Sequence, residues 1–403
     1  MHKSAKQKKT IVFLGYGFLP DRIEAVKIIV YDLAKKLAQR NYEIVIITAA
    51  DTPIEKQKIS EGVHLYAVPF RKTLNPVKVF LSSRRFIDEA VRIINENHAA
   101  LIHDHFVLAY SSRLSIKIAR RTKLPLVKTF RVEGFKIREL KSHFICTLPW
   151  LKEYLFKLIL DSYLLRKIIA AHIHYLVVSS SGLAYEFRQY HPQLLYDGVG
   201  DHFFKIGSKI RTTSSSPHRV LYLGHPSRKK GVEYLIQAIN SVAERIPEVV
   251  FSFAFSNVGK DKRFFEEILK KQNIDPKKIE VMGVVSPGEA FGKADIFVLP
   301  LPYSWSATSL PLSAVESLAC GTPIIISDRG SHVELVKGNE TGFLLKDNFA
   351  TEIATYLNRY LSDQELVHRM KHEATNFAKK FHWDYTLDKY EDLYQKILGA
   401  INA

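Results

Sequence analysis

The stretch that decides the fold is Leu310-Pro-Leu-Ser-Ala-Val-Glu-Ser-Leu-Ala-Cys-Gly-Thr-Pro-Ile-Ile-Ile-Ser327. It follows an apolar strand, Ile296–Pro300, and a loop, Leu301–Ser309. The pattern predicts a short helix that ends at Gly321, followed by a buried strand that a proline opens. A helix that begins behind a strand directs its unpaired backbone N–H groups toward the edge of the sheet where ligands bind. The stretch therefore predicts a diphosphate site.

Glu316 within this helix has two interpretations. In the first turn, its carboxylate would accept hydrogen bonds from a ribose. Alternatively, Ser313-Ala-Val-Glu316 has the spacing of a capping box, in which the glutamate serves the helix itself. The spacing alone favours the cap.

Working outward, strands and helices alternate through both halves of the chain. The first half of the chain contains apolar, strand-like runs at 10–14, 43–48, 63–68, 100–103, 126–130 and 175–179. The second half contains such runs at 220–223, 249–255, 279–282, 295–299 and 323–327. Helical spacing separates them, as at Ala25–Ala38 and Val232–Arg245. Such alternation implies parallel sheets covered on both faces, and here two doubly wound sheets in tandem.

The expected division places one α/β domain at residues 1–204 and another at 219–380. Between them, residues 205–218 form the linker, because Arg211-Thr-Thr-Ser-Ser-Ser-Pro217 is polar and ends in proline. The tail from about 348 onward is helical, and residues 381–403 are expected to pack back on the first domain. Ligands are expected beyond the carboxyl ends of the strands and in the cleft between the domains.

Composition narrows the classes of protein and partner. With 403 residues, 46% of them hydrophobic, the chain can bury two cores. Its two cysteines, Cys146 and Cys320, suit a reducing cytoplasm better than a disulfide framework. We expect neither a signal peptide nor a spanning helix. The net charge of +17 implies an anionic partner, but the basic residues are dispersed and no nucleic-acid motif accompanies them, so nucleic acid is not expected.

Residues 137–173 interleave basic and apolar side chains and have two interpretations. The first is ordinary helix packing in the core. The second is a surface helix that docks on an anionic membrane, which would place the protein peripherally on the inner membrane face. The basic residues of the second interpretation are Lys152, Lys157, Arg166 and Lys167.

The stretch resembles the donor-binding segment of family 4 retaining glycosyltransferases, which have the B-type fold. Glu316-Ser-Leu-Ala-Cys-Gly-Thr-Pro323 matches the second half of that segment. The resemblance continues at 220–231, 283–286, 295–300, 327–334, 340–344 and 381–387, and more weakly at 31–37, 102–106 and 177–180. It implies a GT-B fold: two Rossmann-like domains facing a central cleft, with a C-terminal helix that crosses back to the N-terminal domain.

The resemblance also implies roles. The donor would lie on the C-terminal domain and the acceptor on the N-terminal domain. Lys230, aided by His225, would stabilise the departing diphosphate, and Glu316 would hold the ribose. Backbone N–H groups of residues 309–312 would bind phosphate. No metal ligand and no cofactor are implied beyond a UDP- or GDP-linked sugar.

Several positions depart from the family pattern. Thr308 replaces the first glutamate of the pair, His225 replaces an arginine, and Arg131 replaces a histidine. Glu24-Ala25 stands where the first domain usually has two glycines, and side chains there keep the backbone further from a phosphate. His103 and His105 lie on the preceding strand unit. A metal site at this pair is not expected, because no further ligands accompany it.

The candidate residues fall into three groups. The catalytic group is Lys230, His225, Arg131 and His105. The donor-binding group is Gly224, Arg228, Gly283, Val285, Thr308, Ser309, Leu310, Leu312 and Glu316. The acceptor-side group is Gly15, Gly17, Glu24 and His103.

Two functions follow. The first is a retaining glycosyltransferase that acts on a glycan, lipid-linked or small-molecule acceptor. The alternative, raised by the departures, is a glycosyltransferase-like protein that binds a nucleotide sugar with weak or no catalysis.

Overall fold

A computed structural model describes residues 8–19, 24–70, 76–134, 161–209, 217–255 and 261–401. The chain divides into two compact units. Unit 1 comprises Met1–Tyr196 and Thr386–Ala403, and unit 2 comprises Asp197–Tyr385. No helix among the described residues is both long enough and apolar enough to cross a membrane.

Unit 1 is built on an eight-stranded sheet with the order β3-β4-β2-β1-β5-β6-β7-β8. Every neighbouring pair is parallel except β3 and β4. The strands are β1 (Lys9–Tyr16), β2 (Tyr42–Ala50), β3 (Ile54–Ser60), β4 (Val63–Pro69), β5 (Ala99–Asp104), β6 (Leu126–Phe130), β7 (Tyr175–Val178) and β8 (Gln193–Leu194).

Both faces of this sheet are covered. Val12 and Leu14 of β1 belong to the apolar cluster formed with α2 and α3, whereas the alternate residue Phe13 meets the rings of His103 and His105 on the other face. Besides the C-terminal helix, the described helices of unit 1 are α1 (Ala25–Gln39), α2 (Pro76–Glu96), α3 (Ser112–Thr122), α5 (Tyr163–Ala170), α6 (Ser181–Glu186) and the 3-10 turns η1 (Ala109–Ser111) and η3 (Arg188–Tyr190).

Unit 2 contains a six-stranded, fully parallel sheet with the order β11-β10-β9-β12-β13-β14. In chain order this is 3-2-1-4-5-6, the arrangement of dinucleotide-binding folds. The strands are β9 (His218–Leu223), β10 (Val249–Ala254), β11 (Ile279–Met282), β12 (Ile296–Leu299), β13 (Ile324–Ser327) and β14 (Gly342–Leu345). They are short apolar runs because a parallel sheet buries both faces.

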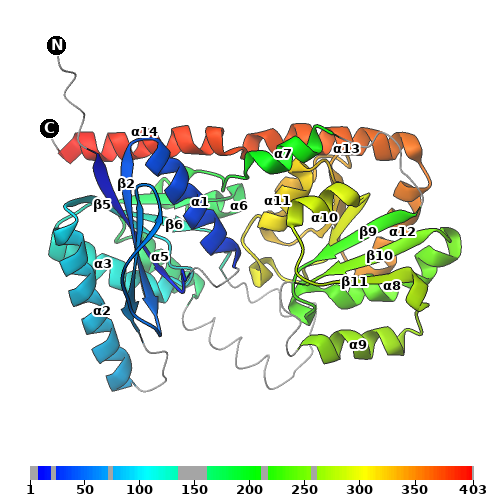
Figure 1. The fold of residues 1–403 in the computed structure, drawn as a ribbon, viewed down its shortest axis with the longest axis horizontal. Helices are drawn as coiled ribbons and strands as arrows, with labels where there is room; N and C mark the ends of the chain where they lie inside the picture. The colour runs from blue at the N-terminus through cyan, green and yellow to red at the C-terminus, as the bar shows by residue number, and fades with distance from the viewer. Residues whose placement is uncertain are drawn as a thin grey trace, which may run out of the picture. The chain divides into compact units, whose positions relative to one another are not determined.

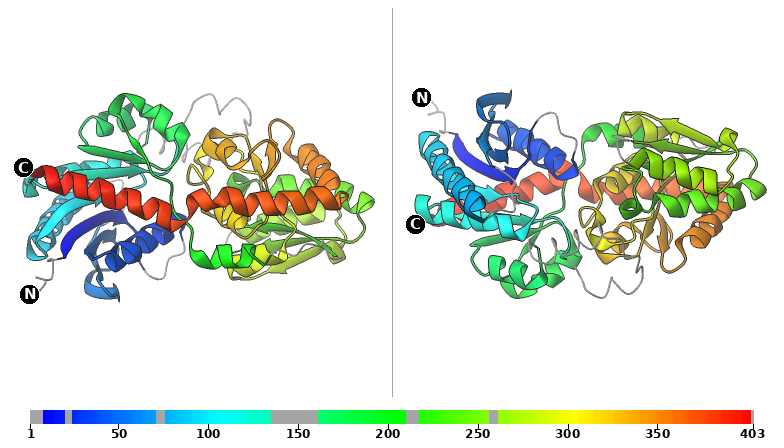
Figure 2. Two further views of the ribbon diagram at one scale, coloured as in Figure 1. Left: turned by 90° about the horizontal axis from the view of Figure 1, so that it is seen from above. Right: turned by 90° about the horizontal axis from the view of Figure 1, so that it is seen from below.

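The helices of unit 2 form two layers. α8 (Val232–Arg245) and α12 (Phe349–Leu361) pack together over one face, and their apolar side chains form one cluster with β9, β10 and β12. α7 (Asp201–Gly207), α10 (Pro287–Lys293), α11 (Leu312–Ala319) and α13 (Gln364–Ala378) contact one another in a second group. Figures 1 and 2 show these elements. The remaining elements are α9 (Asp261–Lys271), η4 (Arg228–Lys230), η5 (Pro276–Lys278), η6 (Ser304–Ser306), η7 (Gly330–Leu335) and η8 (Lys379–Phe381).

The C-terminal helix α14 (Trp383–Ile401) begins in unit 2 and belongs to unit 1 from Thr386 onward, as the resemblance implied. Trp383 is fully buried against Gly198, and the Thr386 hydroxyl donates to the Tyr196 carbonyl at 2.9 Å. Arg40 after α1 pairs with Glu391 of α14 at 2.6 Å.

The chain passes between the units earlier than residue 204. α7 packs on α10 and α11, and a Cβ on Gly207 would stand 2.3 Å from the Ala319 carbonyl oxygen. Residues 197–209 therefore belong to unit 2, although the sequence placed the end of the first domain and the start of a linker there. Residues 210–216 of that linker lie outside the described residues. Strand β3 was not expected, because its sequence IEKQKIS is mostly polar and its side chains are largely exposed.

Candidate functional site

The strand order of unit 2 reverses between β9 and β12. These strands are neighbours, and the connections that leave them run to opposite sides of the sheet, so the loops 224–231 and 300–311 both lie at the carboxyl edge. Open α/β sheets bind ligands at such a position, and we call the place between the two loops the crevice. The two loops are joined directly, because the Lys230 ammonium donates to the Ser306 carbonyl at 2.6 Å. The topology thus brings Lys230 and the segment before α11 to one place.

Backbone geometry holds the first loop against the second. Gly231 has φ +70°, and a Cβ on it would lie 2.2 Å from the Pro300 carbonyl oxygen. Only glycine satisfies both conditions. The His225 carbonyl accepts hydrogen bonds from the Tyr222 hydroxyl at 2.7 Å and from the Ser227 N–H at 2.8 Å. The loop that starts at Gly224 is therefore folded before any ligand binds.

Three of the candidate cations lie on this loop. Lys230 is half-buried at the crevice, whereas the side chains of His225 and Arg228 are exposed. The Arg228 guanidinium lies over the Phe264 ring of α9 at 5.1 Å from its centroid. The loop therefore has one cation in the crevice and others at its rim.

An acid that the sequence analysis missed lies beside these cations. Glu233 is in the first turn of α8, and its Oε2 is buried without a hydrogen-bond partner. Burial raises the pKa of its carboxyl to about 7, against the opposing effects of its own backbone N–H and of Arg228. Its position three residues after Lys230 was the only available signal, and an acid in a first helical turn is ordinary.

The second loop positions Thr308, which stands where the family that the sequence resembles has its first glutamate. Thr308 is 6% exposed, and its hydroxyl donates to the Leu310 carbonyl at 2.8 Å. Ser309 and Leu310 are also buried. The Thr308 proton is therefore used within the loop, and its oxygen remains only as an acceptor.

Helix α11 resolves the two interpretations of Glu316. The N-cap residue is Pro311, which makes no side-chain cap, and Ser313 is already the second helical residue. The capping box is thus absent. Glu316 is the fifth helical residue and not in the first turn, which corrects the expected position. It is buried, and its charge adds to the effect of burial in raising the pKa of Cys320 to about 12.

The start of α11 keeps backbone donors available. The N–H groups of Ala314 and Val315 both donate to the Pro311 carbonyl, at 3.0 and 3.2 Å. The helix itself therefore leaves the N–H groups of Leu312 and Ser313 for another acceptor. The positive end of the helix dipole favours an anion there.

Gly283 and Val285 lie further away. They follow β11, which is the edge strand of the sheet. One strand, β10, lies between β11 and β9. Gly283 is exposed, and nothing lies within 4 Å of the position that a Cβ would take. These residues share the carboxyl edge with Lys230 but form its outer end.

In unit 1, the corresponding reversal lies between β1 and β5. His103 of β5 is fully buried, and both ring nitrogens are hydrogen bonded: Nδ1 to the Tyr394 hydroxyl at 2.6 Å and Nε2 to the Thr129 hydroxyl at 2.7 Å. Burial lowers the pKa of His103 well below its usual value, and Arg131 and Lys128 add to this. His103 thus connects the sheet to α14.

His105 and Arg131 meet beyond the same strands. The Arg131 Nη1 group lies 2.9 Å from His105 Nδ1, and the His105 ring lies 3.9 Å from the His103 ring, centroid to centroid. Burial lowers the pKa of His105 well below its usual value, and His103, Arg131 and Lys128 reinforce the effect. Beneath them, Lys128 pairs with Asp104 at 3.3 Å in a fully buried ion pair.

The loop after β1 carries the remaining candidates. The Gly17 N–H donates to the Ala49 carbonyl at 3.0 Å, and a Cβ on Gly15 would overlap the Phe18 ring. Glu24 is the exposed N-cap residue of α1 and makes no side-chain cap. Gly15 therefore allows Phe18 to pack closely.

Arg166 is not a surface residue, which corrects one of the expected membrane contacts. It is fully buried, with its Nε 2.9 Å from Glu186 Oε1 and its Nη1 3.5 Å from Asp161 Oδ2. Lys167 is half-buried and donates to the Glu186 carbonyl. Residues 137–160, including Lys152 and Lys157, lie outside the described residues.

Two further features bear on ligand binding. Among the described residues, no group of three or more His, Cys, Asp or Glu side chains could hold a metal ion.

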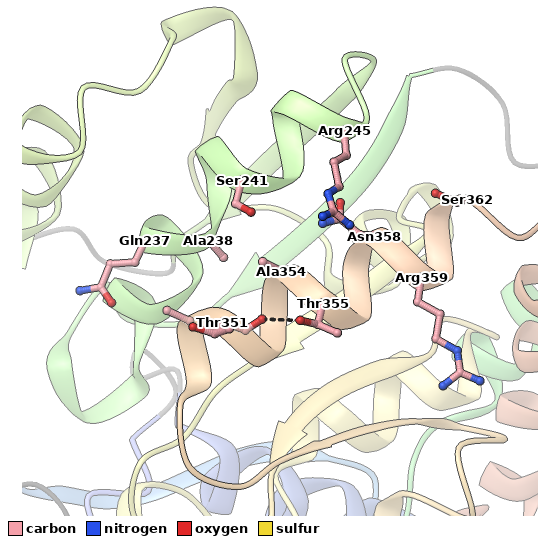
Figure 3. Close-up of a pocket in the computed structure, with 11 residues that line it drawn as sticks. Gln237, Ala238, Ser241, Arg245, Thr351, Ala354, Thr355, Asn358, Arg359 and Ser362 are labelled. Carbon is pink, nitrogen blue, oxygen red and sulfur yellow. Dashed lines mark hydrogen bonds between the residues drawn. The ribbon is translucent and has the colours of Figure 1, made fainter.

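A groove of about 560 Å³ lies between α8 and α12, and Figure 3 shows Arg245 of α8 directed toward Asn358 of α12, with Arg359 pointing away from α8. This groove lies along the helices and not at the carboxyl edge, so it is separate from the crevice.

Comparison with known proteins agrees with this geometry. Residues 208–377 match the family model of glycosyl transferases group 1. A D-inositol 3-phosphate glycosyltransferase of Corynebacterium jeikeium is 26% identical over 186 residues, which are 44% of this chain and 43% of that protein. The chain spans about half the length of the curated relatives it matches.

Solved structures share the fold over nearly the whole chain. Sucrose-phosphate synthase from Thermosynechococcus elongatus superimposes with a TM-score of 0.78 at 17% identity and covers 98% of this chain and 100% of its own. The Anabaena protein HepE, solved in complex with UDP and glucose, gives 0.70 at 15% identity, with 95% and 99% coverage. Residues 208–377 thus match the glycosyl transferases group 1 model, and the chain as a whole shares the GT-B fold of these solved structures.

Proposed function

We propose that this protein is a retaining glycosyltransferase of the family 4 type that moves a sugar from a UDP- or GDP-linked donor to an acceptor, without a metal ion or further cofactor. The observation that carries the proposal is the contact between Lys230 and the Ser306 carbonyl, which joins a cation to the loop that leads into α11. HepE, of the same fold, was solved with UDP and glucose, which supports a nucleotide-sugar donor.

The donor diphosphate would bind between Lys230 and the N–H groups of Leu312 and Ser313. The Lys230 ammonium, which the Ser306 carbonyl positions, would neutralise the leaving group as its charge develops. Arg228 at the rim would supply a second positive charge next to the diphosphate. His225, in place of the arginine of the family pattern, carries a charge only when it is protonated. Glu316, which is buried in α11 and is not part of a capping box, would accept a hydrogen bond from the ribose.

The test is transfer or hydrolysis across a panel of UDP- and GDP-sugars, with Lys230→Met and Lys229→Met as a matched pair. Loss of one preorganised donor costs roughly 10²–10³ in kcat, so Lys230→Met should fall by that factor while Lys229→Met stays within a few fold. Equal effects of the two variants would place the charge elsewhere. No turnover with any donor by a folded protein would contradict the proposal.

A second candidate is a nucleotide-sugar-binding protein without catalysis. The specific observation that favours it is Thr308, whose hydroxyl hydrogen is committed to the Leu310 carbonyl where the family carries a carboxylate. Calorimetry with UDP, GDP and their sugars separates the two functions. Saturable binding without product would support the second candidate, and Thr308→Glu would then be expected to restore or raise turnover.

The acceptor would be a glycan, a lipid or lipid-linked glycan, or a small molecule on unit 1, and a lipid acceptor implies contact with an anionic membrane. On α5, Tyr163, Leu164 and Ile168 are exposed apolar residues, whereas Arg166 is buried. Vesicle binding is therefore expected to depend on the apolar residues: Leu164→Ser with Ile168→Ser should reduce sedimentation with anionic vesicles at low salt. Unchanged sedimentation would remove the membrane from the proposal.

A further inference from the structure

The groove between α8 and α12 has the size and shape of a small-molecule site. Its volume is about 560 Å³, and ligand pockets in proteins occupy roughly 300–1,000 Å³. Its floor is made of small side chains, because Ala238 of α8 and Ala354 of α12 are buried where the two helices pack together. The helices therefore meet at alanines and leave a hollow between the longer side chains on either side (Figure 3).

Two polar stripes line this hollow. On α8, the polar lining residues recur at intervals of four: Gln237, Ser241 and Arg245. On α12, they recur at intervals of four and three: Thr351, Thr355 and Asn358. Residues at these intervals lie on one face of a helix. Each helix therefore contributes a row of hydroxyl, amide or guanidinium groups to the same groove.

The groove has positive charge and no negative charge. The Arg245 side chain is directed toward Asn358 on the opposite helix, whereas Arg359, at the rim, points away from α8 (Figure 3). The described residues that line the groove include no aspartate or glutamate, and no carboxylate in the described part of the chain pairs with Arg245. A guanidinium offers a planar fork of N–H donors that matches an anion. The groove therefore favours a ligand with an anionic group.

The Asn358 side chain adds a second requirement. Its Oδ1 is buried, and none of the described residues forms a hydrogen bond with it. Buried polar atoms without partners are rare, so this oxygen requires an explanation. An amide oxygen only accepts hydrogen bonds, as a carboxylate or an ionised phosphate does, so an anionic group cannot pair with it. The ligand must also offer a donor, and a hydroxyl group is the simplest one.

Two other kinds of ligand lack the contacts that they need. No aromatic side chain occurs among the described residues that line the groove, so a nucleotide base would find no stacking surface. Within the described chain, none of the large exposed apolar residues lies on α8 or α12, so these helices lack the side chains that insert into a membrane. A small molecule with hydroxyl groups and one anionic group fits the groove better than either.

We propose that the groove between α8 and α12 binds a small anionic carbohydrate, a sugar that has a phosphate or a carboxylate. Arg245 would bind the anionic group, and one sugar hydroxyl would donate to Asn358 Oδ1. The Thr355 hydroxyl donates to the Thr351 carbonyl at 2.9 Å, so its oxygen would accept from another sugar hydroxyl. The site does not depend on the proposed function, because its residues lie along the helices and not at the carboxyl edge of the sheet.

Calorimetry with the full chain tests the class of ligand. The probes are glucose 6-phosphate, glucuronate, glucose and inorganic phosphate. Binding of glucose 6-phosphate alone assigns a phosphate, and binding of glucuronate alone assigns a carboxylate. Glucose lacks the group that Arg245 binds, and inorganic phosphate lacks the sugar hydroxyls, so both should bind at least about tenfold more weakly. No binding of either anionic sugar, or equally tight binding of inorganic phosphate, would overturn the proposal.

Substitutions locate the site. Arg245→Met should raise the Kd of the anionic sugar roughly 10–100-fold, and Asn358→Leu about 2–10-fold. Arg369→Met is the matched control, because Arg369 is an exposed arginine of α13 outside the groove, and its Kd should equal that of the wild type. In urea without ligand, Asn358→Leu should unfold at or above the wild-type midpoint, because it removes a buried acceptor that has no partner. An unchanged Kd in Arg245→Met, or a lower midpoint in Asn358→Leu, would contradict the proposal.

Competition separates this site from the crevice. Neither saturating UDP nor Lys230→Met should change the Kd of the anionic sugar, because Lys230 lies at the carboxyl edge of the sheet. Competition by UDP would place the sugar in the crevice and overturn the groove as its site. Turnover of nucleotide sugars is measured separately, so a protein that binds the anionic sugar without turnover would refute the proposed function and leave the groove site standing.

Discussion

Replacing Glu233 with glutamine tests how burial acts on the acid beside the crevice. One carboxyl oxygen of Glu233 is buried without a partner, and the pKa is raised from 4.5 to about 7. Between those two pH values the folded protein keeps the proton that the unfolded chain releases. The free energy of unfolding should therefore fall as the pH rises through this window and stay level above pH 7.

The magnitude follows from the width of the window. Each pH unit of pKa difference corresponds to about 1.4 kcal/mol, so the full shift amounts to about 3 kcal/mol. The side chain is half-buried, and solvent screening reduces the effect to about 1–3 kcal/mol. The helix dipole favours a charged acid in this first turn by only about 0.3–1 kcal/mol, so desolvation prevails.

Glu233→Gln should therefore stabilise unit 2 by about 1–3 kcal/mol at pH 8 and by little at pH 4.5. Urea unfolding at pH 4.5, 6 and 8 measures the difference. Glu289→Gln is the matched control, because Glu289 is also in the first turn of a helix in unit 2 but is exposed. A destabilised Glu233→Gln protein at pH 8, or one with the wild-type pH dependence, would refute the reasoning.

Two other substitutions test the close contacts of each unit. Gly231→Ala should destabilise unit 2 by about 1–3 kcal/mol or more, because alanine is strained at φ +70° and its Cβ would meet the Pro300 carbonyl oxygen. Gly283→Ala is the control: its Cβ would enter open space, so this variant should unfold at the wild-type urea midpoint. Tyr394→Phe removes the hydroxyl from His103 and should cost about 1–3 kcal/mol of unit 1 stability in the same assay, and no loss would show that the 2.6 Å contact is not a hydrogen bond.

The local sequence was sufficient to predict the architecture. Strand and helix patterns alternate because a parallel sheet buries both faces, and this periodicity is visible without tertiary information. The polar strand β3 escaped prediction because its side chains are largely exposed and make no apolar pattern. The assignment of residues 197–209 to a domain also differed from the prediction, because α7 packs on α10 and α11, and such packing cannot be read from the composition of a linker.

By itself, the sequence determined the two doubly wound sheets, the loop that contains Lys230 and Gly231, and the helix that contains Glu316. Each follows from residues close together in the chain. Only the tertiary structure decided that Glu316 does not cap its helix, that one carboxyl oxygen of Glu233 is buried without a partner, and that Arg131 holds His105. These outcomes depend on hydrogen-bond geometry and on the exclusion of water by segments that are distant in the sequence. The spacing of residues along the chain predicts neither the hydrogen-bond geometry nor the exclusion of water.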